Sequence, residues 1–259
     1  MTSHDRSGGA VPPTLPRKHG PIVTRSDVPK DQNFTEYRQY LRHDFFYSCG
    51  YCTISEAEAK ALRFTIDHYE PRSARPDLEH EYSNLMYLCD QCNMLKGDRC
   101  PPLGARSNDY RFFRPDQDVY QEHFKKNGIR LESKSNVGYY SIEALDLNRL
   151  ALRRLREIRE RLTKCDRHVA EGVFGLRNLH IDNLPQSIKG KAVHAISRAT
   201  DVADRIADDI DVLLREYAHS QLIDPDPEAA SRAEERASKL EGLQALYPGR
   251  WRAPRKSRS

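Results

Sequence analysis

The sequence predicts an α+β fold in which a small unit built around cysteine pairs precedes a mainly α-helical C-terminal extension. Three observations support this prediction. Two cysteine pairs, each with two-residue spacing, lie at 49–52 and 89–92. Short β-prone segments, FTIDH at 64–68 and LMYL at 85–88, fall between the two pairs. From residue 148 onward, apolar residues recur at three- and four-residue steps, which is the period of a helix.

The composition restricts the classes of protein to consider. The 259 residues are 38% hydrophobic and 31% charged, with a formal net charge of +4. No stretch approaches the roughly 20 apolar residues that cross a bilayer, and the first residues lack the apolar region of a secretory signal. We therefore expect a cytoplasmic protein with no membrane association, and a charge compatible with a polyanionic partner.

The chain divides by composition into five expected parts. Glycine, serine and proline dominate the beginning, whereas basic residues dominate the end. We expect a flexible N-terminal arm at 1–33, a metal-organised domain at 34–115, a hairpin and loop connector at 116–147, a helical extension at 148–225, and a charged helix with a basic tail at 226–259.

The first half predicts short elements. Phe34–Phe46 has apolar residues at helical spacing, so a short helix is expected to lead into the first cysteine pair. Strands at 64–68 and 85–88 are joined by a long excursion that contains two prolines. The segment after the second strand, CDQCNMLK, is expected to be a short helix that ends at Gly97.

The second half predicts long helices. Before them, IRLES and VGYYSI are expected to form a hairpin. A helix begins at Asn148, a second runs roughly over Ile188–Tyr217, and the apolar stripes of the two are expected to pack together. From Arg149 to Arg167, eight basic residues stand against three acidic ones. That basic face is either solvated and ion-paired or in contact with phosphates.

The cysteine pairs predict a structural zinc site. Four of the six cysteines, Cys49, Cys52, Cys89 and Cys92, form two CxxC pairs with 36 residues between the inner cysteines. Zn²⁺ prefers four tetrahedral ligands, and each CxxC turn presents two thiolates to one ion. Chance spacing and a redox CxxC are the alternatives, but the βαβ context of a redox motif is missing.

The residues between the cysteines resemble a known family. The run CGYC, TIDHYEP and YSNLMYLCDQCNMLKGD is similar to the HNH endonucleases, specifically the zinc-containing ββα-metal type. The resemblance covers Cys49 to Asp98, about a fifth of the chain. It implies a ββα-metal core and hydrolysis of phosphodiester bonds.

The resemblance also implies roles for four residues. His68 matches the general base that activates water, and Asp67 matches the adjacent carboxylate that binds a divalent ion. Asn84 matches the central asparagine that orients the catalytic loop. Asn93 stands at the last position, where the name of the family has histidine, and matches the second metal ligand. Two oxygen ligands favour Mg²⁺ or Mn²⁺ at the catalytic centre over Zn²⁺.

Basic residues near this motif are candidate phosphate contacts. Lys96 follows Asn93 by one helical turn and is expected to approach a phosphate. Arg72, Arg75 and His80 lie on the excursion between the strands and are candidate contacts to a nucleic-acid backbone.

Three functions compete at this point. The first is a metal-dependent HNH endonuclease that nicks or cleaves nucleic acid, DNA more than RNA, as a bacterial defence effector. The second is a zinc-organised nucleic-acid-binding module without catalysis. The third is a partner-docking protein whose helical half binds a second protein. The segment PDLEHEYSNL is similar to HNH proteins of anti-phage systems, in which the partner is often an ATPase. Double-strand cleavage by one site per chain would favour a homodimer.

Overall fold

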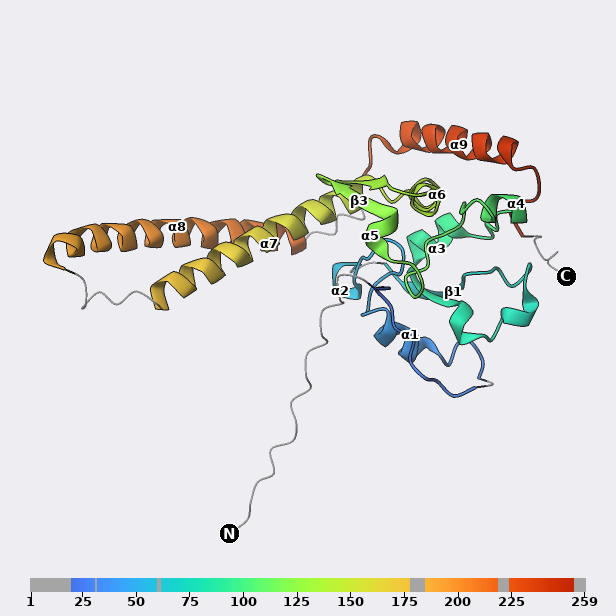
Figure 1. Cartoon of the computed structure of the whole chain (residues 1–259), viewed down its shortest axis with the longest axis horizontal. Coiled ribbons are helices and arrows are strands. Elements are labelled where there is room, and N and C mark those ends of the chain that lie inside the picture. The colour runs from blue at the N-terminus through green and yellow to red at the C-terminus, as the bar shows by residue number, and fades with distance from the viewer. Residues whose placement is uncertain (1–19, 31, 60–61, 178–184, 219–223, 254–259) are drawn as a thin grey trace, which may run out of the picture.

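The structure is a computed structural model that describes residues 20–30, 32–59, 62–177, 185–218 and 224–253. Figure 1 shows a compact body from which two long helices project side by side. In chain order the elements are α1 (Arg38–Asp44), α2 (Glu56–Ala59), β1 (Phe64–His68), β2 (Leu85–Cys89), α3 (Asp90–Lys96), α4 (Leu103–Arg106), α5 (Tyr120–His123), β3 (Phe124–Asn127), β4 (Arg130–Ser133), α6 (Asn136–Leu145), α7 (Leu150–Arg177), α8 (Gln186–Ala218) and α9 (Ala229–Leu246).

The first two strands and the helix after them form the predicted ββα unit. β1 and β2 are antiparallel, with Phe64 paired to Cys89 at one end and His68 paired to Leu85 at the other. β2 is buried along its whole length, as its apolar sequence LMYLC predicts. α3 follows directly and ends at Gly97, whose φ of 50° is a conformation that glycine adopts without strain. The predicted α+β class is confirmed.

One predicted strand is a helix. The hairpin forms between β3 and β4, so RLES is a strand but VGYYSI belongs to α6. The Ser135 side chain accepts a hydrogen bond from the Gly138 N–H and caps this helix. Gly138 itself sits against the backbone of His123, where a Cβ would lie 2.0 Å from the carbonyl oxygen. The buried environment of α6 and its cap outweigh the β propensity of its aromatic residues.

The core extends beyond the predicted metal-organised domain. Side chains from α1, β2, α6 and the start of α7 belong to one cluster of buried apolar residues, which includes Val23 and Trp251. Val23 also donates its N–H to the Pro115 carbonyl, and Cys100 donates to the Trp251 carbonyl. The described part of the N-terminal arm, from residue 20, is therefore packed rather than flexible as predicted. The described part of the basic tail, up to Ala253, is also packed against the core. Residues 1–19 of the arm and 254–259 of the tail lie outside the described residues.

The two projecting helices confirm the predicted helical extension, in which α7 packs along α8. Several arginines of α7 form ion pairs within the molecule. Arg153 binds Glu228, Arg154 binds Asp224 and Arg161 binds Glu216 at 2.5–2.8 Å. Much of the basic face is therefore ion-paired. Among the described residues, no helix is both long and apolar enough to cross a membrane.

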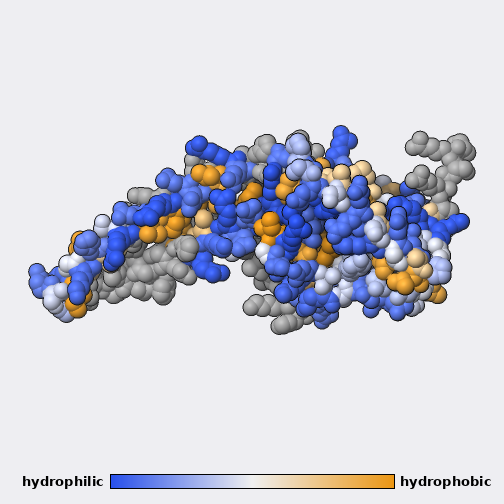
Figure 2. Space-filling model, turned by 90° about the horizontal axis from the view of Figure 1, so that it is seen from above, coloured by the Kyte–Doolittle hydropathy of each residue, from blue (hydrophilic) through white to orange (hydrophobic). Residues whose placement is uncertain are grey.

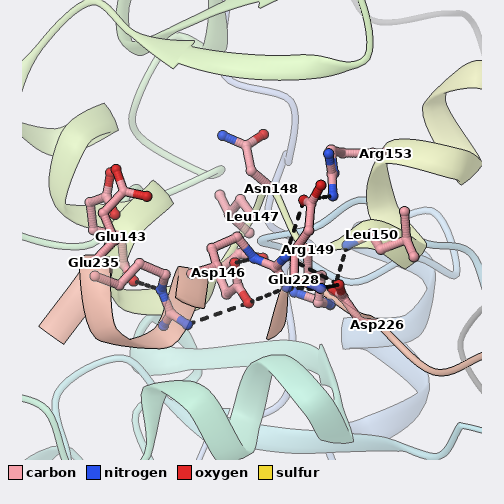
Figure 3. A network of polar contacts seen from close by, with 12 residues as sticks. Glu143, Asp146, Leu147, Asn148, Arg149, Leu150, Arg153, Asp226, Glu228 and Glu235 are labelled. Carbon is pink, nitrogen blue, oxygen red and sulfur yellow. Dashed lines mark hydrogen bonds and ion pairs between the residues drawn. The ribbon is translucent and has the colours of Figure 1, made fainter. Parts of the chain in front are cut away.

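A polar junction holds α9 against the connection between α6 and α7. Arg232 binds both Asp146 and Asp226, and Asp226 accepts a hydrogen bond from the Leu150 N–H at 3.1 Å (Figure 3). Asp146 ends α6 with a φ of 46°. The junction therefore fixes the C-terminal helix to the body by ion pairs as well as by apolar contacts.

On the face that Figure 2 shows, hydrophilic residues predominate and apolar residues gather in separate small patches.

Candidate active site

The four predicted cysteines meet in one buried cluster. The sulfur atoms of Cys49, Cys52, Cys89 and Cys92 all lie within 4.8 Å of one another, and all four residues are buried. Cys49 and Cys52 come from the turn before α2, whereas Cys89 ends β2 and Cys92 lies in the first turn of α3. Burial raises the pKa of the Cys49 thiol well above its usual value. A bound cation would offset that cost by stabilising thiolates.

The surroundings of the cluster fit a metal bound by thiolates. The guanidinium of Arg149, itself buried, lies 3.6 Å from the Cys92 sulfur. Four thiolates around a divalent cation carry a net negative charge, which a buried arginine partly neutralises. The donor set of four sulfurs with no open position is that of a structural zinc site.

Asp67 and His68 lie at the opposite end of the β1–β2 hairpin. Asp67, His68 and Asn93 line one cavity of about 560 Å³. Adjacent residues of a strand normally point to opposite faces. Asp67 and His68 both reach this cavity because β1 ends at His68, where the chain turns into the loop toward Pro71. The structure therefore brings together three of the four residues that the sequence predicts.

The His68 ring is held with one nitrogen facing a backbone carbonyl. Its Nε2 lies 2.8 Å from the Glu79 carbonyl oxygen. A carbonyl can only accept, so Nε2 carries the proton and Nδ1 keeps the lone pair that accepts a proton. The Phe34 ring packs edge-on at 5.1 Å between ring centroids. Burial lowers the pKa of His68, which favours the neutral imidazole that a general base requires.

Asn84 lies behind the cavity and holds the loop together. Its Oδ1 accepts from the Glu70 N–H at 2.9 Å, and its Nδ2 donates to the carbonyls of Glu70 and Leu78. These bonds tie the segment after His68 to the segment before β2. They fit the positioning role that the resemblance implies, without contact to a reacting atom.

The metal-binding candidates keep oxygen atoms for a cation. Asn93 donates its Nδ2 to the Thr65 hydroxyl at 3.0 Å, which leaves its Oδ1 as an acceptor. Asp67 presents a carboxylate at the same cavity. One amide oxygen and one carboxylate fit a hard divalent cation such as Mg²⁺ or Mn²⁺.

Lys96 does not occupy the place that the sequence predicts. Its side chain is fully buried, and its Nζ lies 2.7 Å from the Asp67 carboxylate and donates to the His68 carbonyl at 2.7 Å. The apolar stem turns inward because α3 packs against β1 and β2. Lys96 is thus an internal counter-ion of Asp67 rather than a contact for a phosphate in solvent.

The two predicted arginines differ in position. Arg72 lines the cavity that holds Asp67, His68 and Asn93, where it pairs with Glu79 at 3.0 Å and remains half exposed. Arg75 pairs with Asp77 at 2.6 Å and does not line this cavity. Sequence analysis missed Phe34 and the Glu79 carbonyl. Neither carries a sequence signal, because an aromatic residue and a backbone oxygen are brought to His68 only by the fold.

Comparison with known proteins agrees with this geometry. The family model for HNH endonucleases matches residues 49–99. Residues 49–99 form an HNH domain. The domain holds the cysteine cluster, the β1–β2 hairpin and α3.

A relative is also found among characterised proteins. The chain is 27% identical to the Septu protein PtuA of Bacillus mycoides (strain KBAB4) over an alignment of 137 residues. The aligned region covers 43% of this chain and 19% of the relative. The chain thus spans about a fifth of the length of that protein. No solved structure matches. The match to the HNH family model is confined to residues 49–99.

Proposed function

We propose that this chain is a metal-dependent endonuclease that hydrolyses phosphodiester bonds, with DNA as its substrate. The observation that carries the proposal is the single cavity shared by Asp67, His68 and Asn93 at the end of the HNH hairpin. Phosphodiester hydrolysis needs a base for water and positive charge at the phosphate oxygens. His68 at this cavity supplies the base, and a cation bound by Asp67 and Asn93 would supply the positive charge.

In this proposal each residue has a separate task. His68 accepts on Nδ1 the proton of the water that attacks phosphorus as the bond from phosphorus to the leaving oxygen breaks, while the Glu79 carbonyl fixes the ring. Asp67 and Asn93 would hold Mg²⁺ or Mn²⁺, which would supply positive charge to the phosphate oxygens and to the leaving oxygen. Lys96 neutralises part of the Asp67 charge and orients its carboxylate. Arg72, at the rim of the cavity, contacts the backbone of the substrate.

We further propose zinc as the metal of the cysteine cluster. Four buried sulfurs and the adjacent Arg149 support it. This ion organises the domain and takes no part in the reaction, because the four thiolates leave no open position for substrate.

The relationship to a Septu protein supports a role in anti-phage defence. In this role a second protein, an ATPase of the same defence system, is expected to bind the projecting α7–α8 helices. Because each chain has one HNH site, cleavage of both DNA strands would involve a homodimer.

The test is cleavage of plasmid DNA with Mg²⁺ or Mn²⁺ by the wild type and by His68→Ala. We expect the wild type to nick the plasmid and the variant to lose at least 10²-fold in rate, as expected for removal of a general base. Bound zinc should be the same in both. Linear duplex, single strands and tRNA, assayed in parallel, identify the substrate class. Equal cleavage by the two proteins, or none by the wild type under any of these conditions, would reject the proposal.

A further inference from the structure

A second cavity lies next to the catalytic one and is lined by arginines. It has a volume of about 280 Å³, and its lining includes Arg99, Arg106, Arg111 and Arg114 together with Tyr69 and Glu70. Four of its nine lining residues are thus arginines, against one carboxylate. We call this cavity the arginine pocket.

The carboxylates that hold these arginines account for only part of their hydrogen-bonding capacity. Arg106 uses four of its five donors, because it binds both oxygens of Glu70 at 2.8 Å and also donates to the Pro101 carbonyl and the Cys100 sulfur. Arg111 forms a two-bond pair with Asp118 at 2.7 and 2.8 Å. These two arginines are therefore fixed in place by their partners.

Arg99 and Arg114 keep free donors. Arg114 bonds Asp116 and the Ser83 carbonyl through Nε and one terminal nitrogen, and its Nη1 makes no hydrogen bond to a described residue. Arg99 donates one bond, to the Leu95 carbonyl, and forms no ion pair with any carboxylate in the described part of the chain. Burial and the nearby Arg252 lower the pKa of Arg99. A bound anion would relieve both effects.

The backbone joins the arginine pocket to the catalytic cavity. Glu70 lines the pocket while the next residue, Pro71, lines the catalytic cavity. Arg99 lines the pocket while the preceding residue, Asp98, lines the catalytic cavity. At both places adjacent residues of the chain face the two cavities, so the cavities lie side by side with the backbone as part of the wall between them.

We propose that the arginine pocket binds a phosphate group, namely a backbone phosphate of the nucleic acid beside the one that is cleaved. Guanidinium groups with free N–H donors are the protein groups that best match phosphate oxygens. The identity of the phosphate rests on the proposed nuclease function, whereas the phosphate chemistry rests on the pocket alone. A free phosphate compound such as a mononucleotide is the alternative source.

The test measures binding without cleavage. In a His68→Ala background and without added divalent metal, the affinity for a labelled DNA duplex, single-stranded DNA and RNA is measured against salt concentration. We expect Arg99→Gln to reduce the slope of log K against log salt by about 0.9 for duplex DNA, or about 0.7 for a single strand. Arg99→Lys, which keeps the charge, should retain most of the slope. Arg130→Gln, at an exposed arginine of β4, is the matched control and should leave it unchanged.

Titration of inorganic phosphate and AMP distinguishes the two sources. Arg99-dependent binding of either compound, with an unchanged nucleic-acid slope, would overturn the assignment to the backbone. An unchanged slope with no binding of either compound would overturn the pocket altogether. If the wild type does not cleave the plasmid but the salt slope still depends on Arg99, the proposed nuclease function is rejected and the proposed phosphate site is retained.

A measurement on the unmutated chain covers the case in which Arg99→Gln does not fold. Phenylglyoxal modifies accessible arginines, and the modified peptides are identified by mass spectrometry. We expect bound nucleic acid to protect Arg99 at least several-fold more than Arg130. Equal protection of the two would overturn the proposal.

Discussion

The two ends of the β1–β2 hairpin differ in whether the site beside them is closed or open to solvent. At the end where Phe64 pairs with Cys89, four buried sulfurs face one another and the site is closed. Toward the end where His68 pairs with Leu85, the His68 imidazole and the Asp67 carboxylate face an open cavity, which Asn93 reaches from α3. A closed, saturated site stabilises a fold, whereas an open one leaves room for water and substrate. The cysteine cluster and His68 thus lie toward opposite ends of one hairpin of five residue pairs.

The sharpest way to break this comparison is Cys89→Ser. We expect the variant to lose bound zinc and folded structure together, because binding free energy at a closed zinc site is also folding free energy. Zinc content and circular dichroism measure the two losses. Cys165→Ser, at a cysteine of α7 outside the cluster, is the control and should keep both. A folded, zinc-free, active Cys89→Ser protein would show that the closed end does not support the fold.

Lys96→Met tests whether the catalytic end also contributes to stability. Lys96 is fully buried at 2.7 Å from Asp67, so its removal leaves a largely buried carboxylate without its counter-ion. We expect a loss of about 3 kcal/mol in the free energy of unfolding, measured by urea denaturation. Arg75→Gln removes an ion pair of similar length, 2.6 Å, whose arginine is half exposed, and should leave the midpoint unchanged. An unchanged midpoint for Lys96→Met would show that the Lys96–Asp67 pair does not stabilise the fold.

The smallest expected effect concerns the contact between α7 and the cysteine end. Arg159 on α7 binds Glu58, and Glu58 also accepts from the Ser55 N–H in the capping box of α2. Burial alone would raise the pKa of Glu58, but the bonds from Arg159 and Ser55 outweigh it and lower the pKa below 4.5. Glu58→Gln keeps the capping box and removes the charge.

This lowered pKa gives the variant a defined pH dependence. A carboxyl whose pKa is lowered in the folded state stabilises the fold above its unfolded pKa, and that contribution is lost as pH falls through the folded value. We expect Glu58→Gln to cost about 1 kcal/mol at neutral pH. The difference from wild type should shrink as pH falls below 4.5. Thermal melts across this range measure it, and a difference that does not change with pH would contradict the role of the ion pair.

Local sequence features carried the prediction of the metal cluster and of the hairpin. The two CxxC pairs fix ligand spacing within a few residues, and the apolar run of β2 together with Gly97 marks where the strand and helix begin and end. The cavity shared by Asp67 and His68 was also predictable, because the family motif places them at the end of a strand. These features depend on residues that are close in the sequence, so they can be predicted without knowledge of the fold.

Two predictions were wrong because tertiary packing outweighed the local sequence signal. Residues 137–142 have β propensity but form part of the buried helix α6. The Lys96 side chain turns inward because α3 packs against the β1–β2 hairpin. The composition of the basic tail gave no sign that its start, near Trp251, is bound to the core through Cys100. In each case the deciding partner lies far away in the sequence.

The sequence by itself determined the cysteine cluster and the order of the ββα elements, because both are set by short-range spacing, and the family resemblance implied His68 as the candidate base. Only the tertiary structure decided which nitrogen of His68 is able to accept a proton and that Lys96 is the counter-ion of Asp67. It also brought four arginines together beside the candidate active site. The physical reason is that charges and hydrogen-bond donors act over a few ångströms of space, whatever their distance along the chain.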